Sequence, residues 1–223
     1  MKRIIISLAV LLWAIVAFAE DSESIMLPSD RNHLTVTVAY DASIPGNWKL
    51  ANGSFKMFKP GSGISVGADY MLLFGKNFFF EPGARFYINN YTYNNITIGD
   101  GTPEEPSKMY DPPVRKIGFR IPLTVGYKFD IFKKGSLLLS TGPEPIIGLS
   151  ARTKVDEDQT EIFEEDMYKG LMRRFDIAWD IRAAVIINRF RVDLTGAFGL
   201  LDLIKTDAKM HEYRISIGLG YIF

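Results

Sequence analysis

Large hydrophobic residues alternate with small or polar residues in eight separate segments of this chain. A period of two residues is typical of a β-strand that has one apolar face. The pattern is clearest over 117–129, where the apolar positions are Ile117, Phe119, Ile121, Leu123, Val125, Tyr127 and Phe129. The predicted strands span 34–40, 64–74, 78–93, 117–129, 137–149, 175–187, 190–200 and 213–223.

The connections between these segments alternate in length. Short connections follow the second, fourth and sixth strands: 75–77, 130–136 and 188–189. Long connections follow the first, third, fifth and seventh strands: 41–63, 94–116, 150–174 and 201–212. Short turns at one end and long loops at the other are typical of bacterial outer-membrane barrels. We therefore predict an all-β fold, an eight-stranded antiparallel up-and-down transmembrane β-barrel over 34–223.

A soluble barrel of the lipocalin kind, with its apolar face turned inward, is the competing fold. Each strand offers about five or six large apolar side chains, and an eight-stranded lumen is too narrow to hold them all. Aromatic residues also gather near the strand ends, as in the girdles that sit at lipid–water interfaces. They are Phe74, Phe78, Tyr127, Phe129, Phe190, Tyr221 and Phe223 at the short turns, and Tyr40, Phe86, Phe119, Phe175, Trp179 and Tyr213 at the long loops.

The N-terminus carries an export signal. Two basic residues precede an apolar run from Ile4 to Phe18, and Ala17-Phe18-Ala19 supplies a cleavage site. This pattern predicts a signal peptide over 1–19, cleaved after Ala19, and a periplasmic segment over 20–33. A transmembrane anchor is the alternative, but the run is short of the roughly 20 residues that a spanning helix needs.

The amino-acid composition limits the kinds of binding partner that the chain is expected to have. The chain has no cysteine, which excludes disulfides and a lipoprotein anchor, and its formal net charge is zero, which gives no indication of nucleic-acid binding. We expect a monomer in the outer membrane, in contact with membrane lipid and lipopolysaccharide. A protein partner could bind through the extracellular loops, and no cofactor or metal is predicted.

Three stretches carry a family resemblance: Ser65-Val66-Gly67-Ala68-Asp69-Tyr70, Glu81-Pro82-Gly83-Ala84-Arg85-Phe86 and the terminal Tyr221-Ile222-Phe223. With the eight strands and the loop lengths, they resemble the small OmpA/OmpX-type outer-membrane barrels. The residue pattern of the first two stretches is similar to that of the PorT-like outer-membrane β-barrel domain group. The resemblance implies an outer-membrane location and no single activity.

Charged residues of both signs fall on the strand face made of small residues, which would line the lumen. Charges inside a narrow, low-dielectric lumen must pair or accept hydrogen bonds. The expected structure is a salt-bridged plug, and the alternative is a narrow ion or solute pore. The predicted network contains Asp69, Glu81, Arg85, Arg120, Glu144, Asp176, Asp180, Arg182, Arg191, Asp193 and Arg214.

Four prolines fall within three neighbouring strands: Pro82, Pro122, Pro143 and Pro145. Each removes a hydrogen bond from the ladder or requires a bulge, so we expect local bulges in the wall. The alternative is a weak seam. In the lipid A palmitoyltransferase family, proline-interrupted strands admit a lipid chain sideways, and that resemblance implies a lipid-modifying enzyme with lateral access.

The two histidines lie at opposite ends of the predicted barrel, so they form no metal-binding pair. His211 falls near Asp41 and Ser43 if the barrel closes, which leaves a Ser-His-Asp arrangement open. The alternative is a solvated residue at the rim.

The long loops are the expected working parts, because functional residues concentrate on loops held by a rigid scaffold. The predicted contacts are Trp48, Tyr91, Tyr93, Asp156, Glu157 and Asp158. Asp158 and Glu161 fit a capping box, which predicts helical turns over 159–169. We predict a non-enzymatic barrel that presents four loops for surface interaction, envelope integrity or a secretion assembly.

Overall fold

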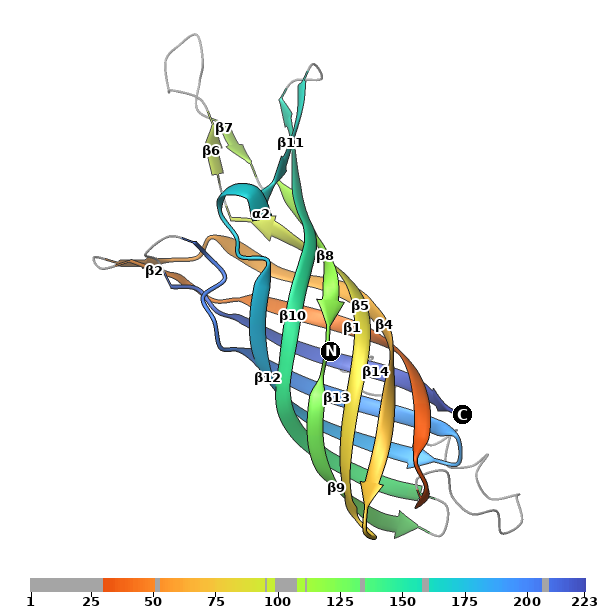
Figure 1. Ribbon diagram of the computed structural model, residues 1–223. Helices are drawn as coiled ribbons and strands as arrows, with labels where there is room; N and C mark the ends of the chain where they lie inside the picture. Colours follow the sequence, from red (N-terminus) through yellow and green to blue (C-terminus); the bar gives the residue numbers. More distant parts are fainter. Residues whose placement is uncertain are drawn as a thin grey trace, which may run out of the picture.

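A computed structural model describes residues 30–50, 53–94, 96–98, 108–110, 112–132, 135–157, 161–205 and 209–223. The predicted signal peptide and most of the segment 20–33 lie outside the described residues. The main sheet of the described residues is antiparallel and closes on itself (Figure 1).

The wall of the barrel has eight strands, as predicted. One of them is divided: β8 and β9 follow each other along the chain, and both pair with β5 on one side and β10 on the other. Strand β14 pairs with β1 and closes the ring. The wall elements are β1 (His33–Pro45), β4 (Phe58–Phe74), β5 (Phe78–Tyr93), β8 (Pro113–Arg120), β9 (Leu123–Phe132), β10 (Gly135–Glu157), β12 (Phe175–Ile187), β13 (Phe190–Gly199) and β14 (Glu212–Ile222).

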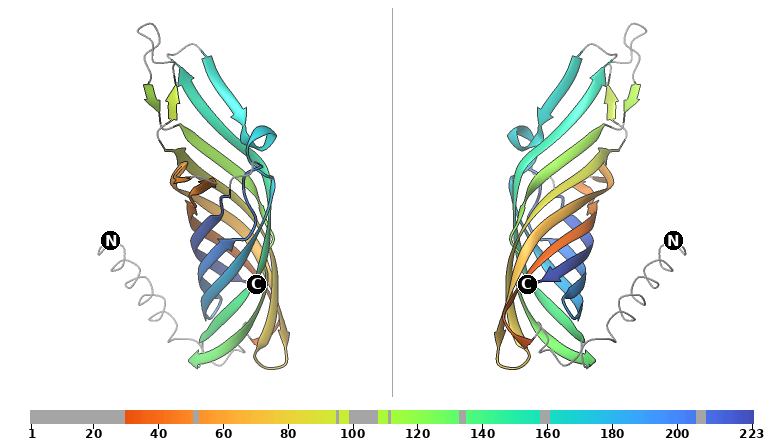
Figure 2. Two further views of the ribbon diagram at one scale, coloured as in Figure 1. Left: turned by 90° about the vertical axis from the view of Figure 1, so that its left-hand side faces the viewer. Right: turned by 90° about the vertical axis from the view of Figure 1, so that its right-hand side faces the viewer.

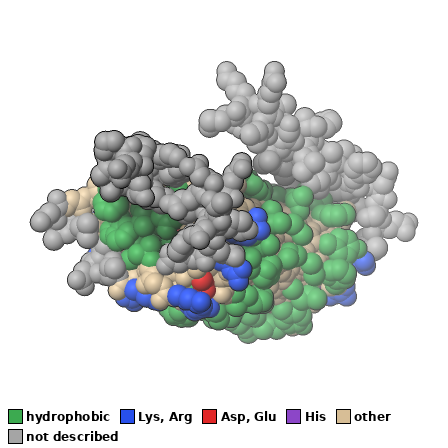
Figure 3. All heavy atoms as spheres, turned by 90° about the horizontal axis from the view of Figure 1, so that it is seen from above, with side chains coloured by type: hydrophobic (Ala, Val, Ile, Leu, Met, Phe, Trp, Pro, Cys, Tyr) green, Lys and Arg blue, Asp and Glu red, His purple; other side chains and the backbone are tan. Residues whose placement is uncertain are grey.

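The two faces of the wall differ as the alternation predicted. Along β1, every second residue from Leu34 to Tyr40 is exposed, and Val38 keeps 57% of its surface accessible, while the residues between them are buried. Hydrophobic side chains cover much of the visible outer wall in Figure 3. The apolar face therefore points outward, toward lipid, and the soluble-barrel alternative is wrong.

Aromatic rings contact one another at the short-turn rim. The ring centroids of Phe78 and Tyr127 are 5.0 Å apart, those of Phe190 and Tyr221 5.6 Å, and those of Tyr221 and Phe223 5.0 Å. Such a girdle belongs at the membrane interface, and the turns beside it face the periplasm in barrels of this class. The long-loop end is then the extracellular end.

Short elements extend from the long-loop end (Figure 2). They are the strands β2 (Trp48–Leu50), β3 (Gly53–Phe55), β6 (Ile96–Ile98), β7 (Lys108–Tyr110) and β11 (Glu161–Asp166), and the helix α2 (Met167–Gly170). Strand β10 runs on past the wall, and its last six residues pair with β11. No helix within the described part of the chain is long and apolar enough to cross a membrane.

The predicted helical turns over 159–169 are wrong for 161–166. That segment is a strand, because the extended end of β10 offers it a ladder of backbone hydrogen bonds, which a local capping signal does not reveal. The helix begins only at Met167, and its N-cap is Asp166, whose carboxylate accepts from the Tyr168 amide.

The four prolines meet at one place in the wall. Strands β8 and β9 are separated at Ile121 and Pro122, Pro82 lies opposite Leu123, and Pro143 and Pro145 lie in β10 between its ladders with β9 and β8. Two backbone hydrogen bonds still bridge the interruption, from Gly83 to Pro122 (2.8 Å) and from Ile121 to Pro145 (2.9 Å). The predicted bulges are wrong, because the facing strands keep the same register on both sides of this interruption. Lateral passage of a lipid stays a prediction.

Candidate functional site

All eleven predicted lumen charges are buried inside the barrel. At the centre, the Glu81 carboxylate accepts hydrogen bonds from Arg182 (2.5 Å) and from Arg191 (2.6 Å). Asp193 lies 2.8 Å from Arg191, and Asp69 accepts from Arg85 at 2.6 Å. Arg182 also lies 3.8 Å from Asp69, so three arginines and three carboxylates from four strands form one network across the lumen.

A second group of charges lies nearer the long-loop end. Arg214 donates to Glu144 (2.7 Å) and lies 3.6 Å from Asp180, while Arg120 donates to Asp41 (2.7 Å). The Arg120 guanidinium also lies over the Tyr87 ring, 4.2 Å from its centroid. Because removing one member of a buried pair leaves an uncompensated charge, these contacts fix the register of opposite walls.

The uppermost polar cluster joins three strands. Glu212 of β14 accepts from Lys116 of β8 at 2.7 Å and from the Tyr91 hydroxyl of β5. Together with Asp41, these lumen residues come from segments that the sequence analysis placed in loops or on the surface. The signal was present in the sequence, since the alternation of β1 continues from Tyr40 through Pro45.

An apolar cluster, which we call the outer cap, closes the mouth above these charges. Its buried members come from the upper wall, from α2 and the residues just after it, and from the segment that precedes β14. Four of the eight methionines belong to it or pack against it, and methionine fills irregular spaces well. The members are Phe58, Tyr91, Val114, Ala151, Met167, Tyr168, Met172, Leu203, Ile204 and Met210, with Trp48, Met57, Tyr93 and Leu171 at its edge.

Tyr168 anchors α2 in the wall. Gly148 of β10 pairs with Gly118 of β8, and each glycine lies beneath the hydroxyl of a buried tyrosine. A Cβ at Gly148 would come within 2.0 Å of the Tyr168 oxygen, and one at Gly118 within 2.7 Å of the Tyr87 oxygen. Burial raises the pKa of the Tyr168 phenol. The two glycines therefore form a socket that a larger residue would fill.

The predicted loop contacts have separate outcomes. Tyr91 is buried and bound to Glu212, and the Tyr93 hydroxyl lies 3.6 Å from the Met167 sulfur, so both hold the cap instead of being displayed. They were misplaced because β5 continues its inward alternation to its end. Trp48 is half-buried and stacks on Phe55, with 5.4 Å between ring centroids.

The structure does not test the predicted contacts of the acidic loop. Strand β10 includes positions 156 and 157, but the side chains of Asp156 and Glu157 are outside the described part, as is all of Asp158. Their role as contacts stays a prediction.

The Ser-His-Asp alternative fails on geometry. His211 contacts the Leu201 carbonyl at 3.2 Å, Ser43 is hydrogen-bonded to Asn89 at 2.9 Å, and Asp41 is held by Arg120 and Ser216. The three side chains therefore serve separate contacts. Across the described residues, no group of three or more potential metal ligands comes together.

The exposed surface at the long-loop end is basic in the described part. Lys49 and Lys209 form a backbone bridge directly opposite each other, with hydrogen bonds in both directions. Arg115 and Arg152 are likewise partners across the β8–β10 ladder. Figure 3 shows lysine and arginine side chains grouped on the visible part of this end, with acidic side-chain atoms between them. The exposed basic residues are Lys49, Lys56, Arg115, Arg152, Lys169, Arg173, Arg174, Lys205 and Lys209.

Comparisons with known proteins identify the class of barrel. A family model described as outer membrane protein beta-barrel domain matches residues 32–205. A search of curated proteins finds no match to the chain.

The chain is also similar, at low sequence identity, to several solved structures of outer-membrane proteins. Ail of Yersinia pestis, in complex with the heparin analogue sucrose octasulfate, is 13% identical over 86% of this chain and 99% of that chain, with a TM-score of 0.40. Neisserial surface protein A is 12% identical over 85% and 97%, with a TM-score of 0.43. OprG of Pseudomonas aeruginosa is 11% identical over 86% and 96%, with a TM-score of 0.43.

Proposed function

Because this chain belongs to the outer membrane protein beta-barrel domain family, we propose that it is a closed barrel that works through its extracellular surface. Its partner is a polyanion of the cell surface, such as the phosphate groups of lipopolysaccharide, and it performs no chemistry. The role of the wall is to hold the outer elements rigidly at the membrane surface. The narrower resemblance to the PorT-like group, and with it a secretion assembly, stays a prediction.

The contents of the lumen support a closed barrel. Its arginines are engaged by Asp69, Glu81, Glu144 and their neighbours at hydrogen-bonding distance, so a passing ion would have to compete with partners already in place. Above them, the outer cap covers the mouth with apolar side chains. The paired lumen charges and the outer cap both favour a closed barrel over a pore.

The observation that carries the proposal is the direct pairing of Lys49 with Lys209. Like charges opposite each other on adjacent strands are destabilising by themselves. Both lysines are exposed, and two further exposed basic residues, Arg173 and Lys205, follow directly after the cap members Met172 and Ile204. An anionic group placed between two ammonium groups would relieve this repulsion and gain charge-assisted hydrogen bonds.

Binding of a compact polyanion tests the proposal. Sucrose octasulfate would be titrated into the refolded barrel in detergent, by calorimetry at low and at physiological salt. We expect binding that weakens as salt rises, because exposed charges are screened. Replacing both lysines, Lys49→Glu with Lys209→Glu, is expected to weaken binding by about tenfold or more.

Lys76→Glu is the matched control, because Lys76 is an exposed lysine in the short turn at the opposite end. It should leave the affinity unchanged. Equal loss in both variants would indicate a nonspecific charge effect, and no binding by the wild type at low salt would refute the polyanion proposal.

A further inference from the structure

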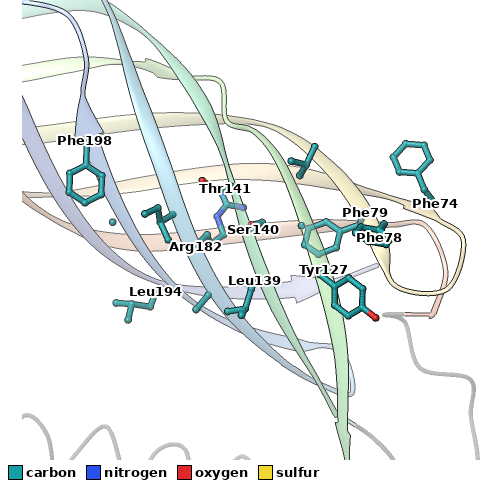
Figure 4. A pocket seen from close by; sticks show the side chains of 15 residues that line it. Phe74, Phe78, Phe79, Tyr127, Leu139, Ser140, Thr141, Arg182, Leu194 and Phe198 are labelled. Carbon is teal, nitrogen blue, oxygen red and sulfur yellow. The ribbon is translucent and has the colours of Figure 1, made fainter.

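The outer wall carries an apolar groove that the proposed function does not use. Its volume is about 880 Å³, and its lining comes from β4, β5, β9, β10, β12 and β13. Figure 4 shows Phe74, Phe78 and Tyr127 at one end of the lining and Leu194 and Phe198 at the other. The groove therefore runs from the short-turn rim to Phe198, which pairs with Trp179 and Tyr213 near the long-loop end.

Small side chains make the floor of the groove. Ala183 of β12 lies in register between Leu139 and Leu194, and Gly196 lies opposite Ile181. A Cβ built on Gly196 would meet no heavy atom within 4 Å, so the space above it is open. Large side chains beside small ones leave a furrow in an otherwise continuous apolar wall.

The lining leaves no place for a charged ligand. Arg182 is a lining residue, but its guanidinium points into the lumen and binds Glu81. Its charge therefore does not face the groove. Among the outward-facing lining residues the polar groups are the hydroxyls of Thr141 and Tyr127, and Thr141 is already engaged with the Asp180 carbonyl and the Trp179 indole. The ligand that fits is a flexible hydrocarbon.

We propose that this groove binds one acyl chain of a phospholipid from the periplasmic leaflet. The groove opens at the aromatic rim where Phe78 and Tyr127 mark the periplasmic interface, so a chain can enter it while its headgroup stays in the interface. An unfilled furrow would lose the dispersion contacts of its lining, and a chain lying in it recovers them. The site holds its lipid more tightly than the smooth wall does.

Native mass spectrometry of the refolded barrel in detergent tests this assignment, with 1-palmitoyl-2-oleoyl-phosphatidylethanolamine as the added lipid. We expect one lipid to bind the wild type with higher affinity than any further lipids. Filling the floor by Ala183→Leu with Gly196→Leu excludes chain contacts worth about two methylene groups, an affinity loss of roughly tenfold. Gly196→Ala alone, which adds one methyl group to open space, should have an intermediate effect.

Ala68→Leu is the matched control, because Ala68 faces outward on β4, away from the groove. It should bind lipid as the wild type does, and a gel-mobility shift on heating confirms that each variant is folded. Equal binding by all variants would show ordinary boundary lipid and overturn the proposal. A dimer mass that disappears in the filled variant, without bound lipid, would assign the groove to a second copy of the chain and also overturn it.

Discussion

The middle of the lumen and its outer mouth fill the same barrel in different ways. In the middle, Glu81, Arg182 and Arg191 join opposite walls through charged hydrogen bonds. At the mouth, the outer cap uses aromatic and methionine side chains from the upper wall and the loops, and Glu212 with Lys116 and Tyr91 forms a polar cluster beneath it. The first region is built by the strands alone, and the second depends on loop segments that fold back over them.

The two regions should respond differently to substitution. A buried charge network tolerates little rearrangement, since each member left alone carries a large desolvation cost. An apolar cluster rich in methionine can repack around a change. We therefore expect substitutions in the middle to affect the whole barrel and substitutions at the mouth to affect the cap.

The largest effect is expected from Glu81→Ala. This change leaves Arg182 and Arg191 buried without their shared carboxylate and should lower the free energy of unfolding by about 3–5 kcal/mol. Urea unfolding of the refolded barrel in lipid vesicles measures it. Lys76→Ala, at an exposed turn, should stay near wild type, and an equally stable Glu81→Ala variant would show that the network does not hold the walls together.

A smaller effect is expected from Met210→Ala in the outer cap. Met210 is buried, with 1% of its surface exposed. Deleting its side chain should lower the free energy of unfolding by about 2–3 kcal/mol, the lower part of the usual range, because the cap can collapse into the space. The loss should appear as faster proteolysis of the segment 201–205, with the membrane-embedded strands still protected. Simultaneous loss of protection in those strands would contradict the separation of the two regions.

The smallest effect on stability is expected from Gly148→Val, which fills the socket of Tyr168. Overpacking of this kind costs about 1–3 kcal/mol, and here displacement of α2 relieves part of it. In a Trp179→Phe background, the fluorescence of Trp48, which packs at the edge of the cap, should report the displacement. Gly53→Val is the control, since a Cβ at Gly53 meets no atom within 4 Å, and an unchanged emission in both variants would argue against the socket.

The period of two residues was enough to predict the wall and the eleven lumen charges, because it depends only on which face is buried. Applied further, it would also have placed Tyr91 inside, since Tyr91 shares the parity of Glu81 and Arg85 along β5. Tyr91 and Tyr93 were instead predicted as loop contacts, because they are aromatic residues at the long-loop end of this strand.

Partner choice could not be predicted in the same way. Glu81 and Arg191 are 110 positions apart, and which carboxylate meets which arginine depends on strand stagger and side-chain rotamers. The pairing of Lys49 with Lys209 depends on how two loops meet, and the outer cap depends on the course of α2 and the segment after β13. None of these contacts leaves a local pattern in the sequence.

Single-channel recording of the refolded barrel in a planar bilayer tests the closed lumen most directly. The account predicts no stepwise openings from protein that is shown to be folded by its heat-dependent gel mobility. Steady openings of defined conductance would contradict it and would make the charged lumen an ion path.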